Sequence, residues 1–388
     1  MKPTQPPPTL ASCDGCFLLK RCGQQAAGEL FSCLETDCCR RPKTCQAACP
    51  RSARWPTYVR EIHGRWIEPA HLVQPGKTLT RRLPRYASKV LHSSERPRLL
   101  KWDGPLVASL PETARKVGIS GDAAIASRAY WQLCPESDLI LSGIRPDAEI
   151  ESFWRDARAT GYYRQIAAMR PLAVVAPNFS MYLGVPRFDN IHNIVRQTLV
   201  AERLSDLGVA VIPHLSARED ADWRFWERYL LKNETVGVIA INMSTGRRLS
   251  EFAKDAITQL LRVRDTVNRP LHLLAFSAGT HLDILSKKWG NAITYVNGTP
   301  FSKTVHRQRP TGGRGSRRFT GPGLLPGFDL DLDHLLLKNL RVERERISKR
   351  HGEARGGQPK WRPKLGLDRV TPGGSDTRPG DHERKSQV

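Results

Sequence analysis

The chain has 388 residues, of which 39% are hydrophobic, so it is long enough for one large domain and one small domain around a real core. Its formal net charge is +23, from 61 lysines and arginines against 38 acidic residues. This charge favours nucleic acid, either DNA or RNA, over a membrane as the partner. No stretch approaches the roughly 18 consecutive apolar residues of a spanning helix, and the first residues lack the apolar core of a signal peptide. We therefore expect a cytoplasmic protein.

Residues 1–12 are rich in proline and are predicted to be disordered, and a cysteine-rich module over residues 13–50 follows them. Eight of the nine cysteines fall in this module, and only Cys134 lies elsewhere. In a reducing compartment such a cluster binds metal more often than it forms disulfides. The predicted metal ligands are Cys13, Cys16, Cys22, Cys33, Cys38, Cys39, Cys45 and Cys49.

The spacing of these cysteines leaves the identity of the metal open. The two-residue gap between Cys13 and Cys16 lets both thiolates face one ion in a tight turn. Eight thiolates could fill two zinc sites, or hold one iron–sulfur cluster with spare or structural cysteines. A Cys-Pro pair, here Cys49 and Pro50, is common after ligands of iron–sulfur clusters, whereas base rates favour zinc. We predict zinc, with an iron–sulfur cluster as the alternative, and expect the metal to support a segment too small to fold alone.

Residues 51–104 are rich in arginine and proline and show only faint helix and strand signals, so we interpret them as a connecting segment. From Pro105 onward, short apolar runs alternate with amphipathic stretches, a pattern typical of βα units and a mostly parallel sheet. The apolar runs predict seven strands, at Leu106–Ser109, Asp138–Gly143, Leu172–Pro177, Val209–Pro213, Val236–Ile241, Leu271–Phe276 and Ala292–Val296.

The intervening stretches predict helices at Ala148–Met169, Asn190–Leu207, Asp222–Leu231, Leu249–Val267 and His281–Trp289. Gly208 and Gly290 directly follow two of these helices, where glycine commonly ends a helix. Seven consecutive βα units without an obvious reversal of strand order favour an α/β fold of the TIM-barrel type over residues 105–310, complete or incomplete, rather than an open doubly wound sheet.

The order of the pattern decays after residue 301. Residues 303–318 carry five arginines and one lysine without an acid, and their glycines and proline are expected to prevent regular structure. We interpret this stretch as a phosphate-binding arm in which Arg307 and Arg309 contact phosphate. Residues 311–348 contain the rest of the arm and one predicted helix, Leu335–Ile347, and residues 349–388 are predicted to be a disordered basic tail.

Polar residues follow the predicted strands, at the end where α/β folds bind their ligands. His214 is the histidine best placed to act as a general acid or base. The candidate catalytic residues are Asn178, Ser180, Tyr182, His214, Asn242 and Ser277. The other polar residues at these strand ends are Glu112, Arg145, Ser216, Arg218, Ser244, Thr280, His281, Asn297 and Thr299.

The segment from Ser277 to Asp283 allows two further interpretations. Gly279 and Thr280 begin a predicted helix, where exposed backbone amides could bind phosphate, although Thr280 and Asp283 could equally form an ordinary helix cap. The same segment resembles the nucleophile elbow of α/β-hydrolases, with Ala275 in place of the first glycine. A serine hydrolase would also need a downstream acid and histidine, for which the candidates are Asp283, His306, Asp331 and His334.

The central block from Asn178 to Asn193, with its Asn-Phe-Ser-x-Tyr and Pro-Arg-x-Asp-Asn-x-His-Asn patterns, resembles an uncharacterised domain-of-unknown-function family of bacteria, phages and plasmids. The resemblance covers roughly residues 105–310 and implies a setting in a mobile element. It also implies that Asn297 replaces an acid found in relatives, which argues against a carboxylate-dependent mechanism. The positions that it marks as site-forming are Asn178, Ser180, Tyr182, Pro186, Arg187, Asn190 and Asn193.

These observations favour a nucleic-acid-directed enzyme whose reaction the sequence leaves open. Charge and cysteines predict equally well a non-catalytic nucleic-acid-binding accessory protein of a mobile element, which is the alternative. A serine hydrolase acting through Ser277 is the third and less favoured hypothesis.

Overall fold

In a computed structural model, the chain divides into two compact units, residues 1–352 and 353–388. The structure describes only residues of the first unit. They are residues 48, 54–64, 79, 83–91, 97–99, 102–117, 121–182, 187–244, 250–279, 281–310, 319–320 and 331–350. The cysteine-rich module, apart from residue 48, and the predicted tail beyond residue 350 therefore lie outside the described residues.

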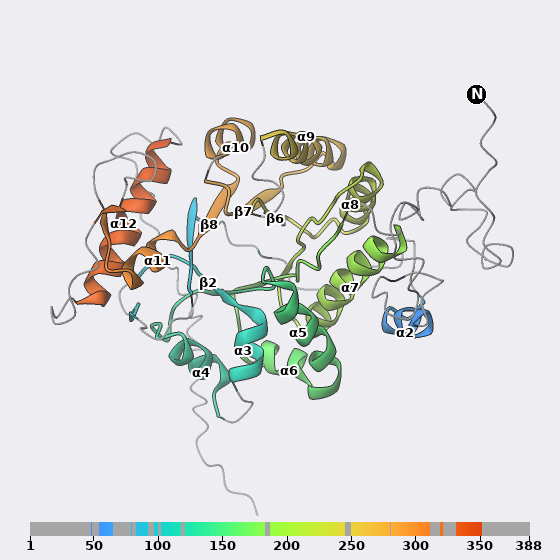
Figure 1. Cartoon of the computed structure of the whole chain (residues 1–388), viewed down its shortest axis with the longest axis horizontal. Coiled ribbons are helices and arrows are strands. Elements are labelled where there is room, and N and C mark those ends of the chain that lie inside the picture. Colours follow the sequence, from blue (N-terminus) through green and yellow to red (C-terminus); the bar gives the residue numbers. More distant parts are fainter. Residues whose placement is uncertain are drawn as a thin grey trace, which may run out of the picture. The chain divides into compact units, whose positions relative to one another are not determined.

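Eight parallel strands form the centre of the first unit (Figure 1). They are β1 (Tyr86–Lys89), β2 (Leu106–Ser109), β3 (Leu139–Ser142), β4 (Ala173–Val175), β5 (Val211–Ile212), β6 (Val238–Asn242), β7 (His272–Phe276) and β8 (Ile293–Asn297). Their order is β5-β4-β3-β2-β1-β8-β7-β6. A parallel bridge between His214 and Ala240 joins the two edges just beyond β5. The Ala240 carbonyl accepts from the Leu215 amide and the Ala240 amide donates to the Pro213 carbonyl, both at 2.8 Å. The strands thus form a TIM-barrel-like fold.

Residues along the strands point alternately into the barrel and towards the helices. One apolar cluster fills the interior and includes Ala87, Val107, Ile140, Val175, Ile212, Ala240, Leu274 and Val296. The positions between them, such as Leu106, Leu141 and Ile239, pack in a second cluster with the surrounding helices. Because both faces are buried, the strands read as continuous apolar runs in the sequence.

Helices surround the strands (Figure 1). Each strand from β2 to β8 is followed by one or two of them. They are α3 (Leu110–Lys116), α4 (Ala123–Tyr130), α5 (Asp147–Thr160), α6 (Tyr162–Ala168), α7 (Arg187–Asp206), α8 (Asp220–Lys232), α9 (Ser250–Val267), α10 (Leu282–Trp289) and α11 (Thr299–Val305).

The seven predicted strands correspond to β2–β8, and the expected helix stops at Gly208 and Gly290 both have positive φ angles. The sequence prediction missed β1, which lies in the stretch interpreted as a connecting segment and pairs with both β2 and β8. The single helix predicted over Ala148–Met169 is wrong in one respect. Gly161 takes a left-handed conformation with φ 73°, so the chain forms two helices, α5 and α6.

The N-terminal part of the described chain packs against α7. Helix α2 (Trp55–Glu61) places Trp55 edge-on against Phe188, with 5.3 Å between the ring centroids. Ala48 is buried, and its amide donates to Oδ1 of Asp189 at 2.8 Å. Residue 48 belongs to the predicted cysteine-rich module, so the end of that module contacts the first turn of α7.

The region after β8 is more regular than we expected. The predicted arm begins inside α11, and Arg309–Pro310 form a strand, β9, that pairs antiparallel with β10 (Phe319–Thr320). The expectation of no regular structure is therefore wrong at these positions, while residues 311–318 lie outside the described part. Helix α12 (Leu332–Arg350) extends the predicted helix at both ends and packs against α10, α11 and β1.

No helix in the described residues is long and apolar enough to cross a lipid bilayer.

Candidate functional site

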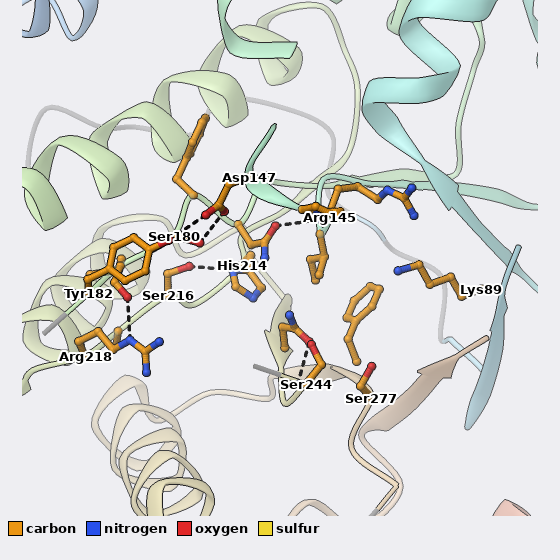
Figure 2. Close-up of a pocket in the computed structure, with 18 residues that line it drawn as sticks. Lys89, Arg145, Asp147, Ser180, Tyr182, His214, Ser216, Arg218, Ser244 and Ser277 are labelled. Carbon is orange, nitrogen blue, oxygen red and sulfur yellow. Dashed lines mark hydrogen bonds between the residues drawn. The ribbon is translucent and has the colours of Figure 1, made fainter. Parts of the chain in front are cut away.

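A pocket of about 510 Å³ opens at the C-terminal ends of strands β1 and β3–β7 (Figure 2). Its position at the C-terminal ends of the strands is where enzymes with this fold carry out their chemistry. Its size is within the range of small-ligand sites. The pocket is therefore the first place in the described chain to look for a function.

The floor of the pocket continues the packing inside the barrel. Side chains two residues apart on a strand share a face, so Lys89 points to the same side as Ala87, and Asn242 to the same side as Ala240. Both Lys89 and Asn242 line the pocket. The apolar interior thus changes at its C-terminal layer to side chains that can bind a ligand.

The loops after β3 and β4 come into close contact at Gly143. A Cβ atom at this residue would lie 2.6 Å from both the Cα and the N of Pro177. The contact is completed by the Asn178 amide, which donates to the Gly143 carbonyl at 3.2 Å, and by Oδ1 of Asn178, which accepts from the Arg145 amide at 3.0 Å. Because Gly143 has no side chain, the two loops can approach closely enough to place Arg145 and Asn178 in the pocket wall.

The single carboxylate among the described residues lining the pocket, Asp147, is held by two hydroxyl groups. Ser180 Oγ donates to Oδ1 at 2.5 Å, and the Tyr182 hydroxyl donates to Oδ2 at 2.8 Å (Figure 2). The hydrogen bond from Ser180 acts to lower the pKa of Tyr182, but burial and the Asp147 carboxylate outweigh it and raise that pKa. Tyr182 thus remains a hydrogen-bond donor at neutral pH.

Two asparagines of α7 hold the backbone of the loop that follows β4. The side chain of Asn190 accepts from the Tyr182 amide at 3.1 Å and donates to the Tyr182 carbonyl at 3.0 Å. Asn193 donates to the Ser180 carbonyl at 2.7 Å. The family resemblance marks both asparagines as site-forming, and in the structure they position the loop without lining the pocket. Of the other two marked residues on this segment, Pro186 lies outside the described part and Arg187 begins α7.

His214 and Asn242 extend from neighbouring strands. The buried imidazole of His214 places Nδ1 2.9 Å from the Ser216 hydroxyl, which fixes the orientation of the ring. Oδ1 of Asn242 accepts from the Ser244 hydroxyl at 2.7 Å and from the Ser244 amide at 3.1 Å. These side chains supply the pocket with hydroxyl, amide and imidazole groups.

Three cationic side chains line the pocket, and they differ in their partners. Arg145 makes a two-pronged ion pair with Glu149, at 2.9 and 3.1 Å. Arg218 uses Nε to donate to the Met181 carbonyl at 2.8 Å, and no carboxylate of the described residues forms an ion pair with it. Burial, reinforced by the charge of Arg145 and opposed by Glu149, lowers the pKa of Lys89 to about 8.

Ser277 follows β7 and has a φ angle of 54°, which is uncommon for a residue other than glycine. A nucleophile elbow has such a conformation, but no described imidazole is hydrogen-bonded to the Ser277 hydroxyl, and His214 contacts Ser216. The nominated acid Asp283 pairs with Arg350, and Asp331 accepts from the His334 amide. The described geometry therefore offers Ser277 as a pocket residue without a triad.

The pocket brings together all six candidate catalytic residues, together with Arg145, Ser216, Arg218 and Ser244. Four other strand-end residues lie outside it. Glu112 accepts from the Tyr130 hydroxyl, His281 precedes α10, Asn297 donates to Glu343 on α12, and Thr299 begins α11.

Of the predicted phosphate ligands, the three that the structure describes do not line the pocket. Gly279 is exposed after β7, Arg307 follows α11, and Arg309 lies on β9. Thr280 is outside the described residues. The expected capping box is wrong, because helix α10 begins after His281 and the Asp283 side chain pairs with Arg350.

Two charged pocket residues, Lys89 and Asp147, were not predicted from the sequence. Asp147 begins helix α5, and Lys89 ends strand β1. Strand β1 reads Tyr-Ala-Ser-Lys, which is too short and too polar for an apolar run, and it lies among arginines and prolines. The available signal was the number of strands, because a closed barrel of this type needs eight and the apolar runs supply seven.

Within the described residues, no group of three or more His, Cys, Asp or Glu side chains could hold a metal ion. The eight cysteines predicted to bind zinc or an iron–sulfur cluster lie outside those residues, so metal binding stays a prediction from the sequence.

No protein-family model matches the chain, and no curated protein is similar to it in sequence. Among solved structures, one similar chain is a Coccidioides immitis protein described as a fructose-1,6-biphosphate aldolase. The TM-score is 0.40 and the identity 10%, over 77% of this chain and 95% of that one. A similarity this weak says nothing about the reaction.

Proposed function

We propose that the protein is an enzyme that acts on nucleic acid and that its reaction takes place in the pocket of the barrel. The observation that supports this most is the charge of the lining. Lys89, Arg145 and Arg218 stand among amides and hydroxyls, while Asp147, the one carboxylate among the described lining residues, is engaged by Ser180 and Tyr182. Guanidinium and ammonium groups in such surroundings suit a phosphate-bearing substrate.

The size of the pocket limits what can enter it. A volume of about 510 Å³ suits a single nucleotide unit and not a duplex. A nucleic-acid substrate would therefore insert one unit of a single strand, or one flipped from a duplex, and its backbone would lie outside. The net charge of +23 supports this arrangement, because basic residues outside the pocket can hold the phosphates of the strand.

Within the pocket, we assign His214 the role of general acid or base. It is the one imidazole among the described lining residues, and its contact with Ser216 fixes the ring. Asn178 and Asn242 are suited to orienting the substrate through hydrogen bonds. Proton transfer by an oriented imidazole typically contributes about 10²–10⁴-fold to a rate.

The proposal is tested by measuring binding and turnover separately. Binding of fluorescent single-stranded and double-stranded DNA and RNA is followed by anisotropy over a range of salt concentrations, and products are separated on denaturing gels. We expect affinity to fall steeply with salt. We expect His214→Gln to lose turnover by at least about 100-fold while binding is kept.

The matched control replaces an exposed arginine on the outer surface, Arg115→Gln, for comparison with Arg218→Gln in the pocket. Only the pocket variant should slow turnover. Binding without any turnover, unaffected by either pocket variant, would favour the non-catalytic accessory protein. Binding that is absent or insensitive to salt would contradict both functions.

A further inference from the structure

Lys89 occupies an unusual place for a lysine. It is the last residue of β1 and lies on the face of the strand that points into the barrel, above Ala87. Figure 2 shows its amine extending towards the middle of the pocket. Lys89 is half-buried, and in the described part of the chain no acceptor is hydrogen-bonded to its amine.

The carboxylates near Lys89 are engaged elsewhere. Glu149 forms both prongs of its ion pair with Arg145, and Asp147 accepts from Ser180 and Tyr182. Arg145 adds a positive charge beside the amine and so disfavours its ammonium form. Lys89 therefore does not form a structural salt bridge with either of these carboxylates.

The same surroundings make the amine reactive. Burial, together with the charge of Arg145 and against that of Glu149, brings the pKa of Lys89 to about 8 from its ordinary value of 10.5. At pH 7.5 such an amine is neutral roughly a quarter of the time, about 200 times more often than an amine of ordinary pKa. Only the neutral amine has the lone pair that attacks a carbonyl carbon.

We propose that Lys89 is a nucleophile that forms an imine with the aldehyde or ketone group of a phosphate-bearing substrate. The lone pair of Nζ adds to the carbonyl carbon, and the carbonyl oxygen takes up a proton to give a carbinolamine. That hydroxyl then leaves as water, and the nitrogen keeps one hydrogen as a protonated imine. Overall, amine, carbonyl compound and one proton from solvent give the protonated imine and one water.

Arg218 supplies the site for the phosphate. Figure 2 shows it on the opposite side of the pocket from Lys89. Its Nε is fixed by the Met181 carbonyl, so its terminal nitrogens are held in place to bind an anion. A carbonyl compound with a phosphate group could therefore place its two ends on Lys89 and Arg218.

Two sources share this chemistry. One is a small phosphorylated aldehyde or ketone, and the other is the ring-opened sugar of an abasic site in DNA, which is an aldehyde flanked by phosphates. The inference of an imine depends on the pocket residues alone. Only the inference that abasic DNA supplies the carbonyl group depends on the proposed function.

The test is reductive trapping of the full-length protein. Sodium borohydride converts an imine into a stable secondary amine, which peptide mapping by mass spectrometry assigns to a residue. The probes are pyridoxal 5′-phosphate, pyridoxal without its phosphate, and an oligonucleotide that contains one abasic site. We expect pyridoxal 5′-phosphate to label Lys89 at least about tenfold faster than the exposed lysines Lys116, Lys254 and Lys287.

Two variants separate the parts of the proposal. Lys89→Arg keeps the positive charge and removes the nucleophile, so labelling at this position should vanish while circular dichroism stays unchanged. Arg218→Gln should slow labelling by pyridoxal 5′-phosphate at least about tenfold and leave labelling by pyridoxal unchanged. In the wild type, the labelling rate should rise with pH and level off above about 8.

The outcomes divide cleanly. Labelling of Lys89 no faster than that of the exposed lysines with every probe would overturn the imine, and equal labelling rates with pyridoxal 5′-phosphate and pyridoxal would overturn the phosphate site at Arg218. Trapping by pyridoxal 5′-phosphate in a protein that binds no nucleic acid would uphold the imine and defeat the proposed function. Trapping of the abasic oligonucleotide on Lys89 would support both.

Discussion

Gly143 shows how the pocket depends on one residue without a side chain. The loops after β3 and β4 approach each other so closely that a Cβ atom at this position would lie 2.6 Å from the backbone of Pro177. Backbone atoms cannot rotate away as the end of a side chain can, so a substitution must separate the two loops. These loops carry Arg145 and Asn178, which are joined by a hydrogen bond of 3.0 Å.

We therefore expect Gly143→Ala to lower the free energy of unfolding by about 1–3 kcal/mol, as overpacking of a tight site does. Ligand binding should weaken as well, because Arg145 and Asn178 move apart. Chemical denaturation measures the first effect. Gly237→Ala is the matched control, since a Cβ atom there would meet nothing within 4 Å. Equal stability of the two variants would show that the loops separate at little cost.

The sequence predicts individual pocket residues well where they follow an apolar run. Asn178, His214, Asn242 and Ser277 all follow such runs, and the structure places all four at the pocket. Lys89 escaped this reasoning because its strand is polar in sequence. An inward-facing residue at the top of a barrel faces the ligand, so selection for binding and not for packing determines its type.

Helix α7 connects the pocket to the N-terminal part of the described chain. On one side, Asn190 and Asn193 hold the loop of Ser180 and Tyr182. On another, buried His192 faces α2, where it lies 3.4 Å from a carboxylate oxygen of Glu61 and edge-on to Tyr58. Among the described residues, the other charged groups that act on His192 are those of Asp189 and Arg196, also on α7.

Burial lowers the pKa of His192, with Glu61 opposing the shift. Its neutral form therefore stabilises the folded state fully above the unfolded pKa of about 6.5, and this stability is lost as the pH falls through the lower folded pKa. We expect the loss of stability between pH 7 and pH 5 to be smaller in His192→Gln than in the wild type. Urea denaturation at both pH values measures it.

The control for this pH dependence is His334→Gln, an exposed histidine of α12 that should leave the dependence as it is. If His192→Gln lost as much stability as the wild type over the same range, acid sensitivity would have to come from groups other than this helix contact.

Element boundaries were predictable where a local signal existed and no long-range contact interfered. The helix ends at Gly208 and Gly290 have such a signal, in glycines with positive φ. The break at Gly161 carries the same residue, but it falls inside an amphipathic pattern that continues on both sides, so periodicity alone joined α5 and α6. Strand β9 depends on pairing with β10, a contact between segments that local sequence does not encode.

The repetition of βα units made the barrel fold predictable from the sequence. The closure of the barrel was harder to predict. Seven βα units indicate a barrel, but closing it requires β1 and a junction between β5 and β6. The junction consists of a bridge at His214, which also lines the pocket. The residue that closes the barrel is thus one of those we assign to its chemistry, and its strand-like pairing is invisible in the sequence pattern.

Residue 48, at the end of the cysteine-rich module, is held by helix α7 of the barrel. Ala48 is buried and bonded to Asp189, one residue before the Asn190 that holds the Tyr182 loop. The end of the module is therefore tied to the same turn of α7 that positions part of the pocket. A metal that orders the module would also steady this turn, which is a supporting role and needs no chemistry at the metal.

Protein purified without oxygen should accordingly contain metal bound by the module. A colourless protein with up to two zinc ions per chain would support zinc sites, and a brown one would indicate an iron–sulfur cluster. Cys33→Ser should lower the metal content, whereas Cys134→Ser, which alters the one cysteine outside the module, should not.

Removal of the metal should lower stability and weaken ligand binding while the barrel stays folded, because Ala48 loses its support but the eight strands do not. Full activity and stability in metal-free protein would mean that α7 holds the pocket unaided.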